Sequence, residues 1–309
     1  MQYIEESITY DVLLSFFNGD YKKAFQAYSQ AESRFDLSMS FPSFSSRLAP
    51  LISARSERLD EIYRNVRDAY GHLRADFIII PSTSALFDRA LCETEYPVPF
   101  LYAVGNIALL AEDHVTICGS LAPTEEARVI AEKCAAVTAR SKRCMMTPLM
   151  LGLSSWAISA FLKESSKLIA VSSSFVLKCP NEKIKDQMVD ILRHGGLIIS
   201  PISPLSADIK YHQVVRNRAI SALSDRILLV EEKDGGPAWH IFDEAKGDDK
   251  VRMISAHMLS IPSFSFAQAR KESSLLLTKA GDVKKLFRPR RRSRKKAESD
   301  ENPSLFQLQ

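Results

Sequence analysis

The N-terminal quarter of the chain carries a helical pattern of apolar positions. Between Leu59 and Leu73, apolar side chains recur at steps of three and four residues, the spacing that buries one face of an α-helix. The turn-forming triplet Asn18-Gly19-Asp20 and a serine- and proline-rich run over residues 38–46 interrupt this pattern. The pattern therefore predicts a small N-terminal domain of short helices over residues 1–75.

Further along the chain, apolar stretches typical of strands alternate with amphipathic stretches typical of helices. The strand-like stretches are residues 77–81, 99–104, 115–118, 143–146, 168–172, 197–200 and 226–231. The intervening helix-like stretches are residues 125–140, 150–164, 181–193 and 214–223. Because these strands are too apolar to leave one face in water, the alternation indicates a parallel sheet that is covered on both sides. We predict a Rossmann-like α/β domain over residues 76–265, with a mostly parallel sheet and helices on both faces.

The C-terminal segment, residues 266–309, changes character after Arg288-Pro289. It becomes rich in arginine and lysine and then acidic, with no apolar periodicity to build a core, so we expect disorder there. Residues 284–301 hold nine Lys or Arg and three acids, which leaves the remainder of a chain of net charge +4 at −2. We expect this tail to attract polyanions through seven side chains: Arg288, Arg290, Arg291, Arg292, Arg294, Lys295 and Lys296.

Composition excludes several other classes of protein. With 309 residues, 46% hydrophobic and 25% charged, the chain is neither fibrous nor disordered as a whole. Five cysteines without CxxC spacing and without a signal peptide indicate a reducing cytoplasm and no disulfide framework or zinc site. The charge-free stretch over residues 147–162 is about four residues short of the roughly 20 that span a bilayer, so we expect no membrane segment.

Ligands of a parallel α/β sheet bind beyond the carboxyl ends of its strands. After the strand that ends at Cys118 comes the loop Gly119-Ser120-Leu121, which leads into a helix and suits phosphate binding by free backbone N–H groups. The loop lacks GxGxxG, and Glu125 and Glu126 would repel a phosphate. A purely structural turn is the alternative interpretation.

Residues 210–224 concentrate cationic and aromatic side chains at a predicted helix N-terminus. Lys210, Arg216 and Arg218 could bind phosphate oxygens, and Tyr211 and His212 offer flat faces for an unpaired base. This mixture suits single-stranded nucleic acid. The alternative is that Arg216 or Arg218 pairs with a carboxylate such as Asp225 and only holds the helix in place.

Several motifs, in order along the chain, resemble the DNA-processing protein A (DprA/Smf) family. Arg216-Asn217-Arg218 with Leu223-Ser224 is similar to its Arg-Asn-Arg helix, and Leu229-Val230-Glu231 to the strand that follows. The resemblance covers about residues 74–261, and its further matches are Pro99 to Gly105, Gly119-Ser120, Ile169-Ala170-Val171, Cys179-Pro180-Asn181 and Gly235-Gly236-Pro237.

The chain also departs from this family's pattern. Leu121 stands in place of the arginine of a Gly-Ser-Arg loop, residues 147–154 lack a glycine and an aspartate of the family's motif, and Gln213 replaces a phenylalanine that meets a base. The resemblance nonetheless implies a non-catalytic recombination mediator that needs no cofactor or metal, binds single-stranded DNA, forms a homodimer and loads the RecA recombinase. It implies DNA contacts from Gly119, Ser120, Thr147, Lys210, His212, Arg216, Asn217 and Arg218.

Two other classes of function stay open. Phosphoribohydrolases of nucleoside monophosphates share the Rossmann plan, but here Gly235-Gly236 is followed by Pro237, and GxSxG, P-loop and HExxH motifs are missing from the sequence. A degenerate scaffold that has kept the fold and lost DNA is the third possibility. Release of the base from nucleoside monophosphates would identify an enzyme. Failure to bind an oligonucleotide would identify the scaffold.

Overall fold

The computed structural model describes residues 2–73, 76–206, 209–233, 235–245, 250–261 and 275–287. The predicted basic residues between Arg288 and Lys296 lie outside the described residues, as does the side chain of Lys210. Among the described helices, none combines the length and the apolar character needed to cross a membrane.

The N-terminal domain is helical, as the sequence predicts. Its helices are α1 (Ile4–Phe16), α2 (Tyr21–Glu32), α3 (Ser45–Leu48) and α4 (Ser56–Gly71), with short 3-10 turns at Phe41–Ser43 and Ala49–Ile52. Asn18 and Gly19 have positive φ, which turns the chain between α1 and α2. Asp20 then caps α2 by accepting a hydrogen bond from the backbone N–H of Lys23.

The second domain contains a sheet of nine described strands. They are β1 (Ile78–Pro81), β2 (Phe100–Gly105), β3 (His114–Cys118), β4 (Cys144–Pro148), β5 (Leu168–Val171), β6 (Leu197–Ser200), β7 (Arg226–Leu229), β8 (Val251–Ser255) and β9 (Leu275–Leu277). Their order across the sheet is β1-β2-β6-β5-β4-β3-β7-β8-β9. The pairs from β6 to β9 are parallel, and only β2 runs against its neighbours β1 and β6. The predicted mostly parallel, Rossmann-like sheet is confirmed.

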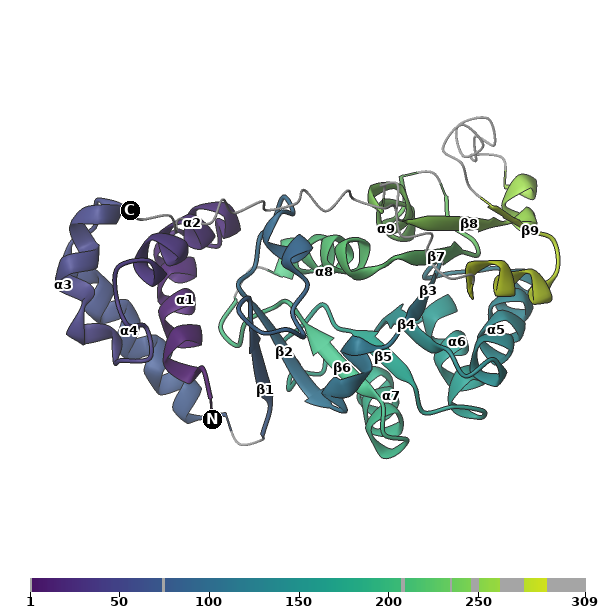
Figure 1. Ribbon diagram of the computed structural model, residues 1–309, viewed down its shortest axis with the longest axis horizontal. Helices are drawn as coiled ribbons and strands as arrows, with labels where there is room; N and C mark the ends of the chain where they lie inside the picture. The colour runs from purple at the N-terminus through teal and green to yellow at the C-terminus, as the bar shows by residue number, and fades with distance from the viewer. Residues whose placement is uncertain are drawn as a thin grey trace, which may run out of the picture.

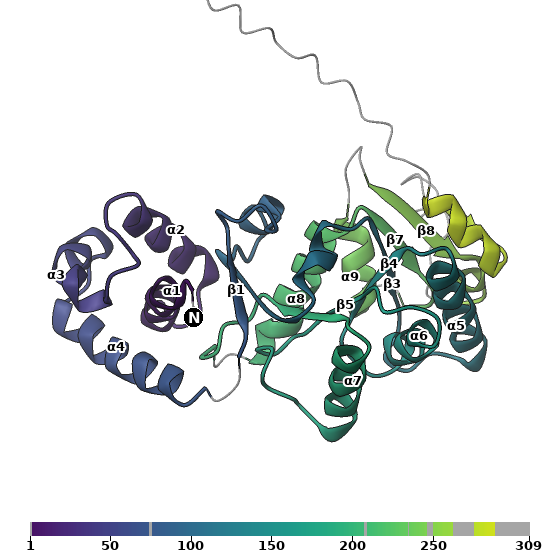
Figure 2. The same ribbon diagram turned by 60° about the horizontal axis from the view of Figure 1, so that its bottom comes forward.

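Helices cover both faces of this sheet (Figure 1 and Figure 2). One face carries α5 (Glu125–Arg140), α6 (Leu153–Leu162) and α7 (Glu182–Arg193), and the other carries α8 (Ile209–Leu223) and α9 (Pro237–Glu244). Crossovers between parallel strands are right-handed, so the helices change face when the chain changes direction across the sheet, after β6. Shorter 3-10 elements are η3 (Arg89–Cys92), η4 (Ile107–Ala111), η5 (Ala256–Ser260) and η6 (Ala280–Phe287).

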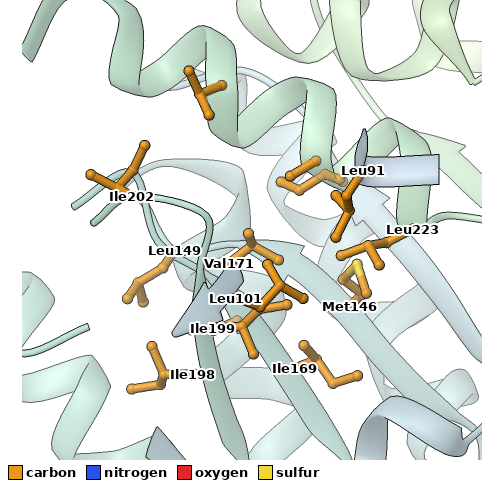
Figure 3. Close-up of a cluster of buried hydrophobic side chains, with 14 of the residues drawn as sticks. Leu91, Leu101, Met146, Leu149, Ile169, Val171, Ile198, Ile199, Ile202 and Leu223 are labelled. Atoms are coloured by element: carbon orange, nitrogen blue, oxygen red, sulfur yellow. The ribbon is translucent and has the colours of Figure 1, made fainter. Parts of the chain in front are cut away.

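The core explains why the central strands are so apolar. Every residue of β4, β5 and β6 is buried, because helices pack on both faces of these strands. Figure 3 shows part of this core, in which Ile169 and Val171 of β5 lie among side chains from β2, β4 and β6, with Leu91 of η3 and Leu223 of α8 nearby.

The sheet continues beyond residue 265, where the sequence analysis placed the end of this domain. β9 pairs in parallel with β8, with Met253 opposite Leu275, and η6 packs against α5. Val283 and Leu286 of η6 are buried. A strand of three residues is too short to show period-two alternation, which is why the sequence pattern did not reveal it.

A buried polar network joins the helical domain to the sheet. Ser7 Oγ on α1 lies 2.7 Å from Tyr70 Oη on α4 and 2.9 Å from Tyr102 Oη on β2. Tyr70 Oη donates a hydrogen bond of 2.9 Å to Asp11 Oδ2. Asp11 is only 1% exposed, and burial raises the pKa of its carboxyl to about 7. The contact between the two domains therefore contains an acid that titrates near neutral pH.

Candidate functional site

The order of the strands reverses beside β3. From β3 the chain proceeds through β4, β5 and β6 on one side, and then returns to add β7, β8 and β9 on the other. The chain therefore leaves β3 and β7 toward opposite faces of the sheet. Open α/β sheets bind their ligands at such a point, beyond the carboxyl ends of the strands. Gly119 and Ser120 follow β3 and Glu231 and Glu232 follow β7, so the predicted Gly-Ser loop lies at this point.

A carboxylate of the protein itself occupies the N-terminus of α5. Glu231 Oε1 accepts a hydrogen bond of 2.9 Å from the backbone N–H of Thr124, and Glu231 Oε2 accepts one of 2.5 Å from Thr124 Oγ1. His257 Nε2 lies 2.6 Å from the same Oε2. Helix N-termini bind phosphate through such free N–H groups and the helix dipole. Here both oxygens of a buried glutamate already supply the negative charge.

The adjacent Glu232 does the same for α9. Its Oε2 accepts a hydrogen bond of 3.1 Å from the backbone N–H of Ala238 in the first turn of that helix. A Cβ on Gly236 would clash with Glu232 Cδ, so only glycine leaves room for this carboxylate. A phosphate at either helix N-terminus would have to displace a buried glutamate, which disfavours the nucleotide-binding alternative.

We expect Glu231→Ala to lower the free energy of unfolding by about 1–3 kcal/mol, because it removes both acceptors from the start of α5. Urea unfolding of the full chain measures this loss. Glu126→Ala is the matched control, since that carboxylate also faces His257 but its side chain is 72% exposed. Its effect should stay within about 0.5 kcal/mol. Equal effects of the two substitutions would contradict a capping role for Glu231.

Arg216 is a buried cation without a carboxylate partner among the described residues. It is 2% exposed, and its Nε and Nη2 donate hydrogen bonds of 3.1 and 2.8 Å to Asn217 Oδ1. Asn217 Nδ2 in turn donates to the carbonyl oxygen of Pro237 at the start of α9, at 2.9 Å. Burial lowers the pKa of Arg216 to about 10, so the guanidinium is still charged at neutral pH. A buried charge of this kind is costly unless an anion approaches it.

Arg218, two residues further along α8, pairs with carboxylates, which is the alternative interpretation given above for the cations of this helix. It forms ion pairs with Glu244 of α9 and with Glu95 of the loop between β1 and β2. Its partners differ from Asp225, which the sequence suggested, because only the folded chain brings the loop and α9 beside α8. Arg218 therefore ties three segments together, and its charge is already neutralised.

The start of α8 is held by the helical domain. His212 Nε2 lies 2.8 Å from Ser206 Oγ, and Ser206 Oγ lies 3.3 Å from Tyr21 Oη of α2. His212 is 6% exposed, whereas its neighbour Tyr211 is 47% exposed. The aromatic face that is open to a ligand at this helix start is therefore that of Tyr211.

The remaining predicted residues lie together at the carboxyl ends of β3 and β4, with little of their surface exposed. Thr147 is fully buried and donates a hydrogen bond of 2.8 Å to the carbonyl oxygen of Ile117. A Cβ on Gly119 would lie 2.7 Å from Leu153 Cδ1, so this glycine permits close packing of α6. Ser120 is half-buried, and its Oγ accepts a hydrogen bond from the backbone N–H of Ala122.

The structure therefore arranges the predicted residues in two groups. Gly119, Ser120 and Thr147 line the switch point, while His212 and Arg216 to Arg218 follow α8. Glu231, Glu232 and His257 were not among the site residues predicted from the sequence. Two glutamates directly after a buried strand were the available signal, because charged side chains at a strand end need partners.

The fold and the site define a Rossmann-like α/β protein with a helical N-terminal domain and cationic side chains on the helix that returns across the sheet. The model of the DNA recombination-mediator protein A family matches residues 78–283, and the chain belongs to this family. The resemblance inferred from the motifs is confirmed.

Individual relatives agree with this assignment. The chain is 28% identical over 176 residues to the DNA processing protein DprA of Streptococcus pneumoniae, and 25% identical over 157 residues to that of Bacillus subtilis. These matches take in 56% and 50% of this chain and 61% and 52% of the two relatives, so the chain spans less than two thirds of their length.

Two solved structures share the fold. The Streptococcus pneumoniae DprA structure matches with a TM-score of 0.67 at 19% identity, over 90% of this chain and 93% of that one. A Helicobacter pylori DprA structure, which concerns the binding of single-stranded DNA by that protein, matches with a TM-score of 0.57 at 19% identity, over 69% of this chain and 96% of that one.

Proposed function

We propose that this chain is a non-catalytic recombination mediator that binds single-stranded DNA. The observation that carries the proposal is Arg216, whose buried guanidinium has only the amide oxygen of Asn217 as an acceptor among the described residues. A phosphate oxygen that replaced this amide oxygen would provide the missing negative charge, and arginine–phosphate hydrogen bonds are among the strong ones. The family assignment supports the same function.

The proposed contacts divide by what their surroundings allow. Arg216 supplies the strongest phosphate contact. The phosphate takes the place of Asn217 Oδ1, which then no longer accepts the hydrogen bonds of Arg216. Ser120 borders the path at the switch point, where the buried Gly119 and Thr147 shape the loop. Lys210 extends the path along α8 beside the mostly buried His212, and Arg218 contributes least because Glu95 and Glu244 neutralise it. We include RecA binding, a homodimer and a cytoplasmic location in the proposal, on the strength of the family.

The internal carboxylates support a function without catalysis. Glu231 and Glu232 occupy the two helix N-termini at which a nucleotide-hydrolysing enzyme of this plan would hold its phosphate. Incubation of the full chain with nucleoside monophosphates tests this part of the proposal. Intact nucleotides are the expected result, and release of the base would replace the mediator with an enzyme.

Binding itself is tested by comparing labelled single-stranded and double-stranded oligonucleotides of equal length over a range of salt concentrations. Tighter binding of the single strand is the expected result. If the full chain binds neither, the degenerate scaffold becomes the better description.

The basic tail contributes a separate, salt-dependent part of this affinity. A chain that ends at Phe287 lacks the seven cationic side chains between Arg288 and Lys296. We expect the slope of log affinity against log salt to fall by several units, at about 0.7 for each phosphate of a single strand that the tail neutralises. A slope equal to that of the full chain would show that the tail does not touch DNA.

A further inference from the structure

A cleft lies between the helical domain and the start of α8. Its volume is about 500 Å³, and it is lined by the turn Asn18–Asp20, Tyr21 and Lys22 of α2, Glu95 and Tyr96 of the loop between β1 and β2, and Tyr211 of α8. Three segments that are far apart in the sequence therefore meet around it. None of the residues assigned above to phosphate or switch-point contacts lines this cleft.

Three tyrosines contact one another in a row along the cleft, the first pair edge to face and the second pair tilted. The ring centroids of Tyr21 and Tyr96 lie 6.1 Å apart at an interplanar angle of 80°. Those of Tyr96 and Tyr211 also lie 6.1 Å apart, at 32°. Tyr21 is 3% exposed and Tyr211 is 47% exposed, so the row of rings runs from the core to the solvent. The ring of Tyr211 thus packs against Tyr96, which in turn packs against the buried ring of Tyr21.

The charges around the cleft set the direction of a bound strand. Lys22 is exposed and pairs with no carboxylate of the described residues, whereas Lys23 pairs with Asp20 at 3.0 Å. Glu95 would repel a phosphate, but it lies 2.8 Å from Arg218 Nη2, which offsets its charge. A polyanion can therefore approach from the side of Lys22, with an uncharged flat group over Tyr211.

We propose that this cleft binds an unpaired nucleobase of single-stranded DNA, stacked on Tyr211, with the adjoining phosphate near Lys22. Aromatic rings stack on every base, so the contact is independent of sequence. The inference rests on the proposed function and extends it, because it makes the helical domain part of the DNA path. Tyr211 directly follows Lys210, so the cleft continues the contacts proposed along α8.

The test uses the full chain and a labelled oligothymidylate. We expect Tyr211→Ala to lower affinity about tenfold, Tyr211→Leu to lower it similarly, and Tyr211→Phe to bind within about twofold of the wild type, because only the last keeps the ring. Val214→Ala, at another exposed position of α8, is the matched control and should bind like the wild type. Thermal melting of Tyr211→Leu and Tyr211→Phe should match the wild type, since the ring is half-exposed.

An oligonucleotide made of abasic sites separates stacking from an indirect effect. The wild type should bind it more weakly, and Tyr211→Ala should cause no further loss. If the wild type binds oligothymidylate but Tyr211→Ala and Tyr211→Leu bind equally well, the cleft is not a base site and only this inference fails. If the wild type binds no single strand, the proposed function fails first. An equal loss for Tyr211→Ala on abasic and normal strands would also overturn stacking.

Discussion

Arg216→Met is expected to lose single-stranded-DNA affinity tenfold or more while the protein stays at least as stable as the wild type. The guanidinium is buried without a counter-charge among the described residues, so an apolar side chain of similar length removes a desolvation penalty. The same change removes charge-assisted phosphate hydrogen bonds, which contribute about 1.5–3 kcal/mol to binding. Oligonucleotide titration and urea unfolding measure the two effects.

Arg218→Met is the matched control on the same helix. This substitution leaves Glu244 without its partner, and the Glu244 side chain is 22% exposed, so we expect stability to fall. DNA affinity should change little, because the charge of Arg218 is already neutralised. Both variants should also be measured in a chain that ends at Phe287, where the basic tail cannot compensate. Lost stability with unchanged affinity in Arg216→Met would assign Arg216 a structural role and favour the scaffold.

Asp11→Asn is expected to stabilise the protein at pH 8 and to have little effect at pH 4. The folded pKa of Asp11 is about 7 and its ordinary value is 3.8, so between these values the folded chain holds a proton that the unfolded chain has lost. Asp11 therefore lowers the free energy of unfolding of the wild type by about 1.4 kcal/mol per pH unit as the pH rises from about 4 to about 7, and it adds no further slope above that range. Asparagine keeps an acceptor for Tyr70 Oη and does not titrate.

Urea unfolding at several pH values between 4 and 8 measures this difference. The two stability curves should approach each other as the pH falls, and parallel curves would refute the assignment to Asp11. Asp36→Asn provides a control in the same domain. Asp36 is exposed, and hydrogen bonds from Ser38 lower its pKa below the ordinary value of 3.8, so both the folded and the unfolded chain have lost this proton above about pH 4. Between pH 4 and 8 the stability of Asp36→Asn should therefore follow the same pH dependence as the wild type.

Because Asp11 lies in the contact between the two domains, its protonation bears on the proposed site. Asp11 bonds to Tyr70, and Tyr21 of the same domain reaches Ser206, which holds His212. Stability of the domain contact and the position of the α8 start are therefore connected through the helical domain. The pH series on Asp11→Asn also shows whether DNA affinity follows the ionisation of this carboxyl.

Short-range pattern was enough to predict the architecture. The strands and the helices between them could be recognised because the central strands are buried on both faces and each helix on one. The spacing of apolar residues along the chain therefore reports which kind of element they form. The segments that escaped prediction are short: β8 has five residues, β9 has three, and α9 has eight and begins at Pro237, directly after Gly235-Gly236. Elements of this length are stabilised by their neighbours in space and not by their own periodicity.

The amino-acid sequence alone was enough for the fold class, the helical N-terminal domain, the family and the set of cationic and aromatic residues on the helix after β6. It left Arg216 and Arg218 equivalent, and only the tertiary structure separated them, by placing Glu95 and Glu244 beside Arg218 and no carboxylate of the described residues beside Arg216. It likewise did not show that Glu231 would accept hydrogen bonds at the N-terminus of α5 or that the rings of Tyr21, Tyr96 and Tyr211 would meet. The physical reason is that local pattern reports how much of a side chain is buried, whereas the partner of a charge or an aromatic ring is set by segments that meet only when the chain has folded.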